Sequence, residues 1–258
     1  MIKENIKFEA SNIFEGMPSI SAVIRSIESG KSDRQILRVI IDENKRRSKS
    51  KEISFIVAKS HQMGFAIEFT DTSAIDSMVV GNTHGGIIAE CTRRSFSVLQ
   101  PKNIKPSGVY YLLEGIEDPY NFGNALRSLY ASGADGVIVG ERNWLDVAGT
   151  VARASAGASE LLDCYIYDTS DAVKLFKESG YKIICAGIRD SVSLFEADLS
   201  KPILVILGGE KRGISRTILE MADMIVRIEY GTDFRGSLSA SASASVLGFE
   251  ILRYNMKK

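Results

Sequence analysis

Short apolar runs alternate with helix-period segments throughout the second part of this chain, from residue 108 to residue 228. The expected strands are rich in valine, isoleucine, leucine and tyrosine: 109–113, 137–139, 164–167, 182–186, 203–207 and 224–228. A helix is expected at 171–179, where Gly180 ends it, and the last one at about 237–254. Short apolar strands separated by helices indicate a parallel sheet with helices on both faces. The sequence therefore predicts an α/β fold.

The first hundred residues predict a smaller α/β domain. Its expected elements are a helix from Pro18 to Gly30, strands at 36–41, 65–69 and 86–91, and a helix at 53–63. After them, Pro101 and Pro106 bracket a polar stretch that is typical of a linker. Because 258 residues exceed a typical domain of about 100 to 200 residues, we expect two domains. They are residues 1–100 and 108–258, joined by a linker at 101–107.

The composition restricts the class of function. Lysine plus arginine and aspartate plus glutamate both number 32, so the whole chain has no net charge that would attract nucleic acid. Cys91, Cys164 and Cys185 have no CxxC spacing, and only His61 and His84 are present. These residues favour buried thiols over a metal site, and we expect no metal. No run approaches the roughly 18 apolar residues of a membrane helix, so we expect a cytoplasmic protein without a membrane partner.

One basic cluster lies in the first domain, where residues 45–51 are Lys-Arg-Arg-Ser-Lys-Ser-Lys. The cluster could be a solvated loop without a function. It could instead contact phosphates, which would give a salt-dependent attraction without sequence reading. Both interpretations remain open from the sequence.

A polar turn, a glycine and an arginine follow the strand expected at 109–113. In open α/β sheets, ligands usually bind outside the carboxyl ends of the strands. Asn121 is expected to cap the next helix, and Gly123 permits a close backbone approach. Arg127 lies near Gly123 on the same helical face and is expected to be buried. The alternative is an ordinary capped turn with no ligand.

A second turn, Leu-Gly-Gly-Glu-Lys-Arg-Gly at 207–213, follows the strand expected at 203–207. Its first and last glycines, at 208 and 213, have the spacing of a P-loop, but Ile214 stands where that loop requires lysine. No GxGxxG occurs either, so nucleoside triphosphate and nicotinamide cofactors are not indicated. The alternative is a tight turn with Glu210 as a surface carboxylate.

A third segment, Ser-Leu-Ser-Ala-Ser-Ala-Ser-Ala-Ser at 237–245, opens the last expected helix. Ser237 is a good N-cap, and small side chains let another backbone or helix approach closely. Low sequence complexity without a function is the alternative.

Together these segments resemble the SpoU (TrmH) family of RNA 2′-O-methyltransferases in the SPOUT superfamily. The motifs that carry the resemblance are 121–127, 207–213, Ile228 followed by 237–241, and the Ser-Ala-Gly-Ala turn at 155–158. The resemblance implies a C-terminal α/β domain with a mostly parallel sheet and a trefoil knot. It also implies a small N-terminal substrate-binding domain that is similar to a ribosomal-protein fold.

The resemblance further implies S-adenosylmethionine as cofactor, ribosomal or transfer RNA as substrate, and a homodimer. The implied cofactor contacts are Leu207, Gly208, Gly209, Ile228, Ser237 and Leu238. The implied catalytic residues are Arg127, Asn121, Glu210 and Ser239. Since an arginine stays protonated, we expect Arg127 to stabilise the developing alkoxide, while an RNA phosphate assists proton removal. A structural salt bridge is the alternative role for Arg127.

Two departures from the family pattern are present. Ser239 stands where the family usually has asparagine, and residues 229–235 replace its usual proline and methionine. A hydroxyl at position 239 has a shorter reach than a carboxamide and could weaken catalysis. The competing hypothesis is therefore a noncatalytic RNA-binding or ribosome-assembly protein that keeps the fold.

Overall fold

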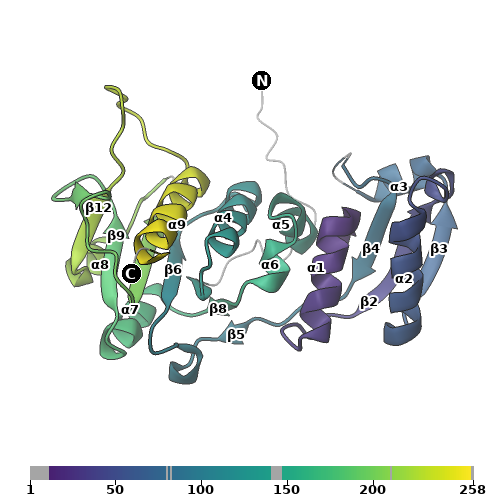
Figure 1. Ribbon diagram of the computed structural model, residues 1–258, viewed down its shortest axis with the longest axis horizontal. Coiled ribbons are helices and arrows are strands. Elements are labelled where there is room, and N and C mark those ends of the chain that lie inside the picture. The colour runs from purple at the N-terminus through teal and green to yellow at the C-terminus, as the bar shows by residue number, and fades with distance from the viewer. Residues whose placement is uncertain (1–11, 80, 82, 141–146, 210, 257–258) are drawn as a thin grey trace. The chain divides into compact units, whose positions relative to one another are not determined.

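The computed structural model describes residues 12–79, 81, 83–140, 147–209 and 211–256. Their contacts divide them into two compact units, one formed by 12–95 with 147–161 and the other by 96–140 with 162–256. Figure 1 labels the elements of both units. This division differs from the expected one, because residues 147–161 make their contacts with N-terminal elements.

The first unit has a four-stranded sheet in the order β1-β4-β2-β3, in which only β2 and β3 are parallel. Its elements are β1 (Ile13–Glu15), α1 (Gly16–Glu28), β2 (Ile36–Asp42), η1 (Glu43–Lys45), α2 (Ser50–Met63), β3 (Ala66–Thr70), α3 (Thr72–Met78), β4 (Ile87–Cys91), α5 (Ala148–Ala154) and α6 (Ala158–Leu161). Helix α1 buries Ile20, Val23 and Ile24 in the core, because apolar residues three and four apart share one helical face.

The segment of α5 and α6 is held in the first unit by a buried ion pair. Arg34 Nε donates to Glu160 Oε2 at 3.2 Å, and both side chains are almost fully buried. The turn between the two helices contains Gly157 at φ +84°. A Cβ atom added there would lie 2.4 Å from Ala22 Cβ in α1, so a glycine is required for this close approach.

The second unit has an eight-stranded sheet in which every pairing is parallel, in the order β10-β12-β9-β11-β6-β7-β8-β5. Its elements are β5 (Ser97–Val98), η2 (Pro101–Asn103), β6 (Val109–Glu114), α4 (Pro119–Ala131), β7 (Gly136–Val139), β8 (Cys164–Ile166), α7 (Thr169–Glu178), β9 (Lys182–Ala186), β10 (Val192–Ser193), β11 (Ile203–Gly208), α8 (Arg216–Met221), β12 (Met224–Arg227) and α9 (Ala240–Met256). Strand β11 lies between β9 and β6, which precede it in the chain.

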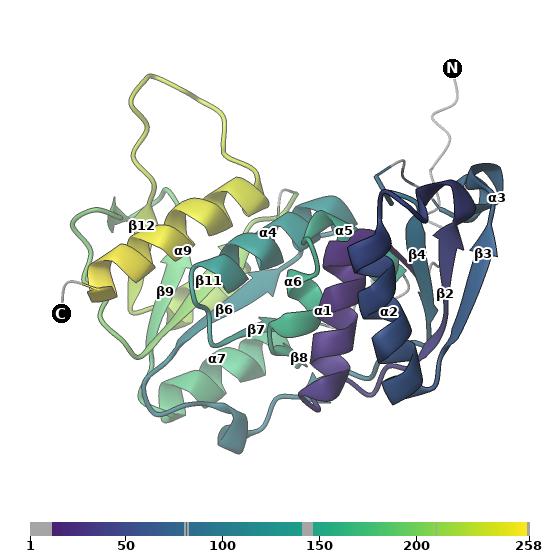
Figure 2. The same cartoon turned by 45° about the vertical axis from the view of Figure 1, so that its right-hand side comes forward.

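Burial explains why the central strands read as unbroken apolar runs. Residues 203–206 of β11 are fully buried, since helices cover both faces of a parallel sheet. On one side of the sheet, the rings of Tyr110, Phe176 and Tyr181 contact one another with centroids 5.0 to 5.8 Å apart. Helices α4 and α9 lie side by side in Figures 1 and 2 and are in direct contact. The predicted α/β fold, with a parallel sheet and a separate N-terminal sheet, is confirmed.

Candidate functional site

The expected site residues of the second unit follow strands that end at one edge of its sheet. Strands β6 and β11 are adjacent, with Leu113 opposite Leu207, and β12 is separated from β11 only by β9. All of these strands are parallel, so their carboxyl ends meet at the same edge. The segments that follow these strands, 115–118, 211–215 and 228–239, therefore begin at the same edge of the sheet.

The turn after β11 is closed by main-chain hydrogen bonds. The Gly209 N–H donates to the Glu114 carbonyl at 2.6 Å, and the Gly213 N–H donates to the Gly209 carbonyl at 3.0 Å. A Cβ atom on Gly208 would lie 2.4 Å from the Gly213 carbonyl carbon. On Gly209 it would lie 2.0 Å from the Gly115 carbonyl oxygen. Both positions therefore exclude a side chain, which the spacing of glycines in the sequence did not reveal.

A small cavity of about 100 Å³ lies beside this turn. Three of its lining residues are the glycines at 115, 209 and 213, so main-chain atoms form much of its wall. At the rim, Lys211 Nζ and Glu117 Oε2 form an exposed ion pair at 2.6 Å. Glu210, an expected catalytic residue, lies outside the described residues.

Helices α4 and α9 connect the first and third motifs. The Ser241 hydroxyl donates to Asn121 Oδ1 at 3.2 Å, and the Ser128 and Ser245 hydroxyls are 2.6 Å apart. The prediction that Asn121 caps α4 is wrong. Asp118 is the N-cap, and its carboxylate accepts the Asn121 N–H at 2.8 Å. The Asp-Pro pair at 118–119 was the available signal, since proline is favoured at the first helical position.

Arg127 lies on α4 about one and two-thirds helical turns after Asn121, and it is exposed. The expectation that it is buried is wrong, because the apolar face of α4 consists of other residues, including Phe122, Leu126 and Leu129. The Arg127 side chain forms no hydrogen bond or ion pair with another described residue, so a structural salt bridge among those residues does not explain it.

The helix cap at the start of α9 is Ser239 rather than the expected Ser237. Helix α9 begins at Ala240, and the Ser239 Oγ accepts the Ala242 N–H at 3.2 Å. Ser237 is exposed and lies outside the helix. The hydroxyl that replaces the family's carboxamide thus already has a structural role as an N-cap.

This role predicts the effect of substitutions at position 239. Ser239→Ala should lower the free energy of unfolding by about 1 kcal/mol, because one helix N–H loses its acceptor. Ser239→Asn should keep the stability, since asparagine caps as well as serine. Thermal denaturation checks both, with Ser243→Ala inside α9 as the control. Equal stability of Ser239→Ala and the wild type would show that the cap is unimportant.

The segment between β12 and α9 carries the remaining expected cofactor contacts. Ile228 follows β12 directly and is half-buried, as is Leu238. The Leu238 N–H donates to the Tyr230 hydroxyl at 3.2 Å, which ties the end of the segment to its beginning. No role for Tyr230 was predicted from the sequence.

In the first unit, the carboxylate of Asp42 anchors the basic cluster. It accepts hydrogen bonds from the Asn44 N–H at 2.9 Å and from the Thr72 hydroxyl at 2.7 Å. Burial acts to raise the pKa of Asp42, but these hydrogen bonds together hold that pKa below its ordinary value. The loop that follows is therefore fixed at its first residue.

The basic residues of the cluster differ in their surroundings. The Arg46 guanidinium lies 3.7 Å from the centre of the Phe69 ring, and Lys49 pairs with Glu52 at 3.0 Å. The other three, Lys45, Arg47 and Lys51, are exposed and form no ion pair with another described residue. Those three are the positive charges available to a partner.

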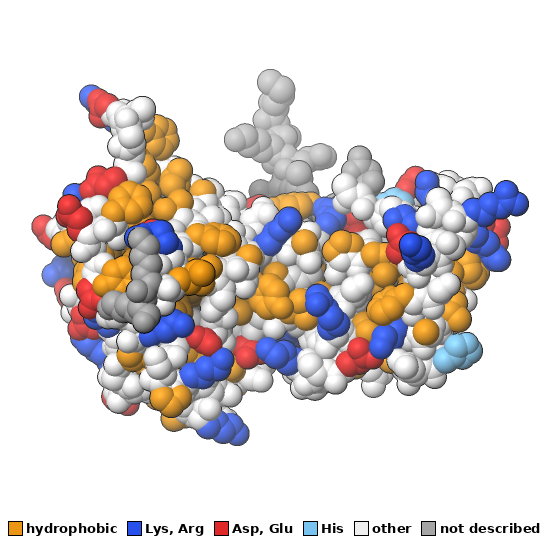
Figure 3. Space-filling view, in the orientation of Figure 1, with side chains coloured by type: hydrophobic (Ala, Val, Ile, Leu, Met, Phe, Trp, Pro, Cys, Tyr) orange, Lys and Arg blue, Asp and Glu red, His pale blue; other side chains and the backbone are white. Residues whose placement is uncertain are grey.

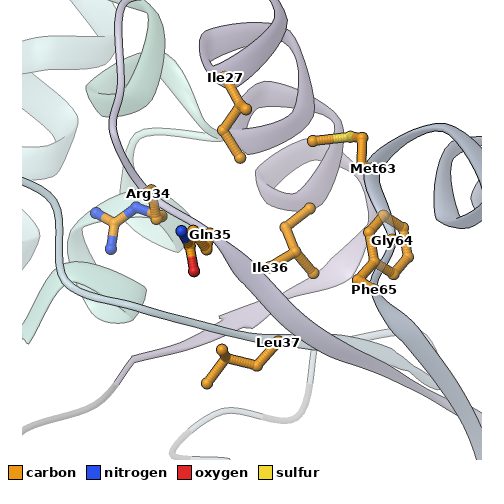
Figure 4. A pocket seen from close by; sticks show the side chains of 8 residues that line it. All are labelled: Ile27, Arg34, Gln35, Ile36, Leu37, Met63, Gly64 and Phe65. Carbon is orange, nitrogen blue, oxygen red and sulfur yellow. The ribbon is translucent and has the colours of Figure 1, made fainter.

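A larger cavity of about 550 Å³ lies in the first unit, between the ends of α1 and α2 and the start of β2. Figure 4 shows Ile27, Leu37 and Met63 around it, with Arg34 at one side. The guanidinium of Arg34 is already bound to Glu160. None of the expected site residues lines this cavity.

The described residues offer neither an exposed cysteine nor a cluster of metal ligands. Cys91, Cys164 and Cys185 are buried, as expected, and form no disulfide. Burial raises the pKa of Cys91 and Cys185 to about 12. In the described ranges, no group of three or more histidine, cysteine, aspartate or glutamate side chains could hold a metal ion. Within the same ranges, no helix has both the length and the apolar character needed to cross a membrane.

Solved methyltransferase structures have a similar fold. An RNA 2′-O ribose methyltransferase matches with a TM-score of 0.78 at 22% identity, covering 95% of this chain and 88% of the other. An rRNA methyltransferase from Sinorhizobium meliloti with bound AdoMet matches with a TM-score of 0.76 at 20% identity and the same coverages. At these identities the likeness concerns the fold.

Curated relatives match over most of their length. A putative TrmH family tRNA/rRNA methyltransferase of Staphylococcus saprophyticus is 29% identical over 238 residues, which are 90% of this chain and 92% of the relative. The Bacillus subtilis protein YacO, also a putative TrmH family tRNA/rRNA methyltransferase, is 26% identical over 235 residues, with coverages of 88% and 92%.

Two family models match successive parts of the chain. The model of RNA 2′-O ribose methyltransferase substrate binding matches residues 20–97. The model of the SpoU rRNA Methylase family matches residues 108–249, which are more than half of the chain and include all three motifs of the sheet edge. The chain therefore belongs to the SpoU rRNA methylase family.

Proposed function

We propose that this protein transfers a methyl group from S-adenosylmethionine to a ribose 2′-hydroxyl of ribosomal or transfer RNA. The observation that carries the proposal is the hydrogen bond between Ser241 and Asn121, which joins the third motif to the first. The second motif follows β11, which is paired with the strand that precedes the first motif. The names of the substrate-binding family model and of the 2′-O ribose methyltransferase structure support the ribose as target.

The residues at the sheet edge fit S-adenosylmethionine, which the structures of the Sinorhizobium meliloti rRNA methyltransferase and of the SpoU methyltransferase AviRb from Streptomyces viridochromogenes hold. When bound, this cofactor supplies a methyl group carried on a sulfonium. A bent adenosyl group that lies against main chain needs positions without side chains. Gly208 and Gly209 provide such positions, and Leu207, Ile228, Ser237 and Leu238 would offer main-chain groups from the neighbouring segments.

Arg127 is the residue that we assign to the reacting hydroxyl. Its guanidinium remains protonated at neutral pH, so it serves as a hydrogen-bond donor to a developing alkoxide and not as a base. Its exposure on α4 leaves it accessible to the ribose and to a neighbouring phosphate. Asn121, on the same helix, is held by Ser241 and would orient the substrate. We assign Glu210 to holding an arginine or the substrate, as the family resemblance suggests.

The first unit would bind the RNA substrate through Lys45, Arg47 and Lys51. We expect the double variant Lys45→Gln/Arg47→Gln to weaken binding to ribosomal RNA. It should also reduce the slope of log affinity against log salt by about one unit for each phosphate that the variant no longer neutralises. Fluorescence anisotropy at several salt concentrations measures both quantities.

The control for this prediction is Lys59→Gln. Lys59 lies in α2 of the same unit, but its ammonium pairs with Glu28 at 2.6 Å. The Lys59→Gln variant should change the slope of log affinity against log salt little. An unaltered slope in the double variant would mean that residues 45–51 form only a solvated loop.

We also propose that the protein forms a homodimer, as its resemblance to the SpoU (TrmH) family implies. Tyr130 of α4 and Phe249 of α9 are 43% and 49% exposed, respectively, although both residues are large and apolar. Contact with a second copy would remove such side chains from water. The small residues at the start of α9 would permit a close approach.

The function is tested with labelled S-adenosylmethionine and RNA from cells that lack this protein. Methylated riboses resist alkaline hydrolysis of the adjacent phosphodiester, so label should appear in alkali-resistant dinucleotides. Label in a base would overturn the ribose assignment. RNA binding without cofactor binding in a calorimetric titration would favour the noncatalytic alternative. DNA of the same sequence is the control, since it lacks the 2′-hydroxyl.

A further inference from the structure

The segment that joins β12 to α9 projects from the sheet of the second unit (Figures 1 and 2). It begins at Ile228 and ends at Ser239, so both ends lie at expected site residues. In Figure 3 the projection shows apolar side chains near its base and charged side chains near its tip. This is the segment whose sequence departs from the family pattern.

Phe234 is an exposed aromatic residue within this segment. Its side chain is held by two neighbours, although 52% of the residue is exposed. The Tyr230 ring lies 5.5 Å away between centroids, with the ring planes tilted by 58°. A Cβ atom on Gly236 would lie 2.5 Å from the Phe234 Cζ, so glycine lets the backbone pass the end of the ring. The Leu238 N–H anchors Tyr230 in turn.

An exposed positive charge follows the ring in the sequence. Arg235 is about 90% exposed, and its guanidinium lies 3.8 Å from the carboxylate of Asp233, which is exposed to the same degree. An ion pair between two such exposed groups contributes little stability. Arg235 can therefore exchange Asp233 for a phosphate at little cost, because a guanidinium binds phosphate through two parallel hydrogen bonds.

An aromatic ring beside an exchangeable guanidinium matches the chemistry of single-stranded RNA. Unpaired bases stack on aromatic side chains, while arginine contacts the neighbouring backbone. A second protein chain covering the ring would have to desolvate Arg235 and Asp233, which is unfavourable. We infer that Phe234 stacks on an unpaired base of the RNA substrate and that Arg235 contacts an adjacent phosphate. The inference rests on the proposed function, because it takes RNA as the substrate.

The test compares two RNA probes with the full-length protein. One probe is a short fluorescent adenine homopolymer, and the other has the same ribose-phosphate chain without bases. Phe234→Leu should lower the affinity for the adenine probe about tenfold, since stacking of one base on an aromatic ring contributes about 1 to 3 kcal/mol and about 1.4 kcal/mol corresponds to a factor of ten. The affinity for the probe without bases should stay unchanged. Phe234→Trp should retain the wild-type affinity for both.

The matched control is Phe195→Leu. Phe195 belongs to the same unit and is 58% exposed, but Glu196 follows it where an arginine follows Phe234. It should leave both affinities unchanged. Equal losses in the two phenylalanine variants would overturn the inference, as would equal losses for the two probes.

Two further measurements exclude other roles of Phe234. A fall in S-adenosylmethionine affinity in Phe234→Leu would mean that the ring covers the cofactor. A change in its oligomeric state would mean that the ring contacts a second copy of the chain. Either result would overturn the inference. Methyl transfer by the wild type is measured separately, so its absence would contradict the proposed function while the two-probe comparison would still decide the stacking.

Discussion

Replacing Arg127 by alanine is expected to lower the rate of methyl transfer to RNA by about a hundredfold to a thousandfold. That is the usual effect of removing one donor that stabilises a developing oxyanion. The affinity for S-adenosylmethionine should stay nearly unchanged, because the expected cofactor contacts lie on β11 and in the segments that follow β11 and β12. Stability should also change little, since the exposed guanidinium forms no bond with another described residue. Single-turnover kinetics and a calorimetric cofactor titration measure the two effects.

Two variants control this prediction. Arg127→Lys keeps a positive charge but loses the planar donor pair, so its rate should lie between those of the wild type and the alanine variant. Arg216→Ala removes an arginine that is about 90% exposed on α8 and pairs only with Glu220 among the described residues, so its rate should equal that of the wild type. An unaltered rate in Arg127→Ala would show that another group acts on the hydroxyl.

Replacing Gly209 by alanine is expected to destabilise the protein and to weaken cofactor binding at least tenfold. The added Cβ would lie 2.0 Å from the Gly115 carbonyl oxygen and 2.4 Å from its carbon. Both are main-chain atoms, so the turn after β11 must move away from β6. Overpacking of this kind costs about 1 to 3 kcal/mol of stability. Thermal denaturation with and without S-adenosylmethionine separates the loss of stability from the loss of binding.

The control for this prediction is Gly231→Ala. Gly231 lies in the same unit, and no heavy atom would lie within 4 Å of an added Cβ. Its stability should change by less than about 0.5 kcal/mol, as for most surface substitutions. Wild-type cofactor affinity in Gly209→Ala would show that this turn does not contact the cofactor.

The strands of the second unit could be predicted because burial leaves a local trace in the sequence. Six apolar runs were expected between 109 and 228, and a strand occurs at each of them. Their spatial order could not be predicted. Strand β11 lies between β6 and β9 because of hydrogen bonds between residues far apart in the chain, such as the pairing of Leu207 with Leu113.

The helix caps and the burial of single side chains could not be predicted reliably from the sequence, because several similar residues compete for each position. Serine occurs at every second position from 237 to 245, and each of them can cap a helix. The contacts of Ser241 with Asn121 and of Ser245 with Ser128 accompany a helix that begins after Ser239. Arg127 was expected to be buried because it lies near Gly123 on the same helical face. The apolar face of α4 consists of other residues, so Arg127 is exposed.

The sequence by itself determined the α/β class, the strands, the family motifs and their order along the chain. These features are local, since each depends on residues within a few positions of one another. Only the tertiary structure decided that Asn121 meets Ser241, that Gly209 lies against Gly115, and that residues 147–161 group with the N-terminal unit. Each depends on the packing of segments that are tens to more than a hundred residues apart, which no local pattern records.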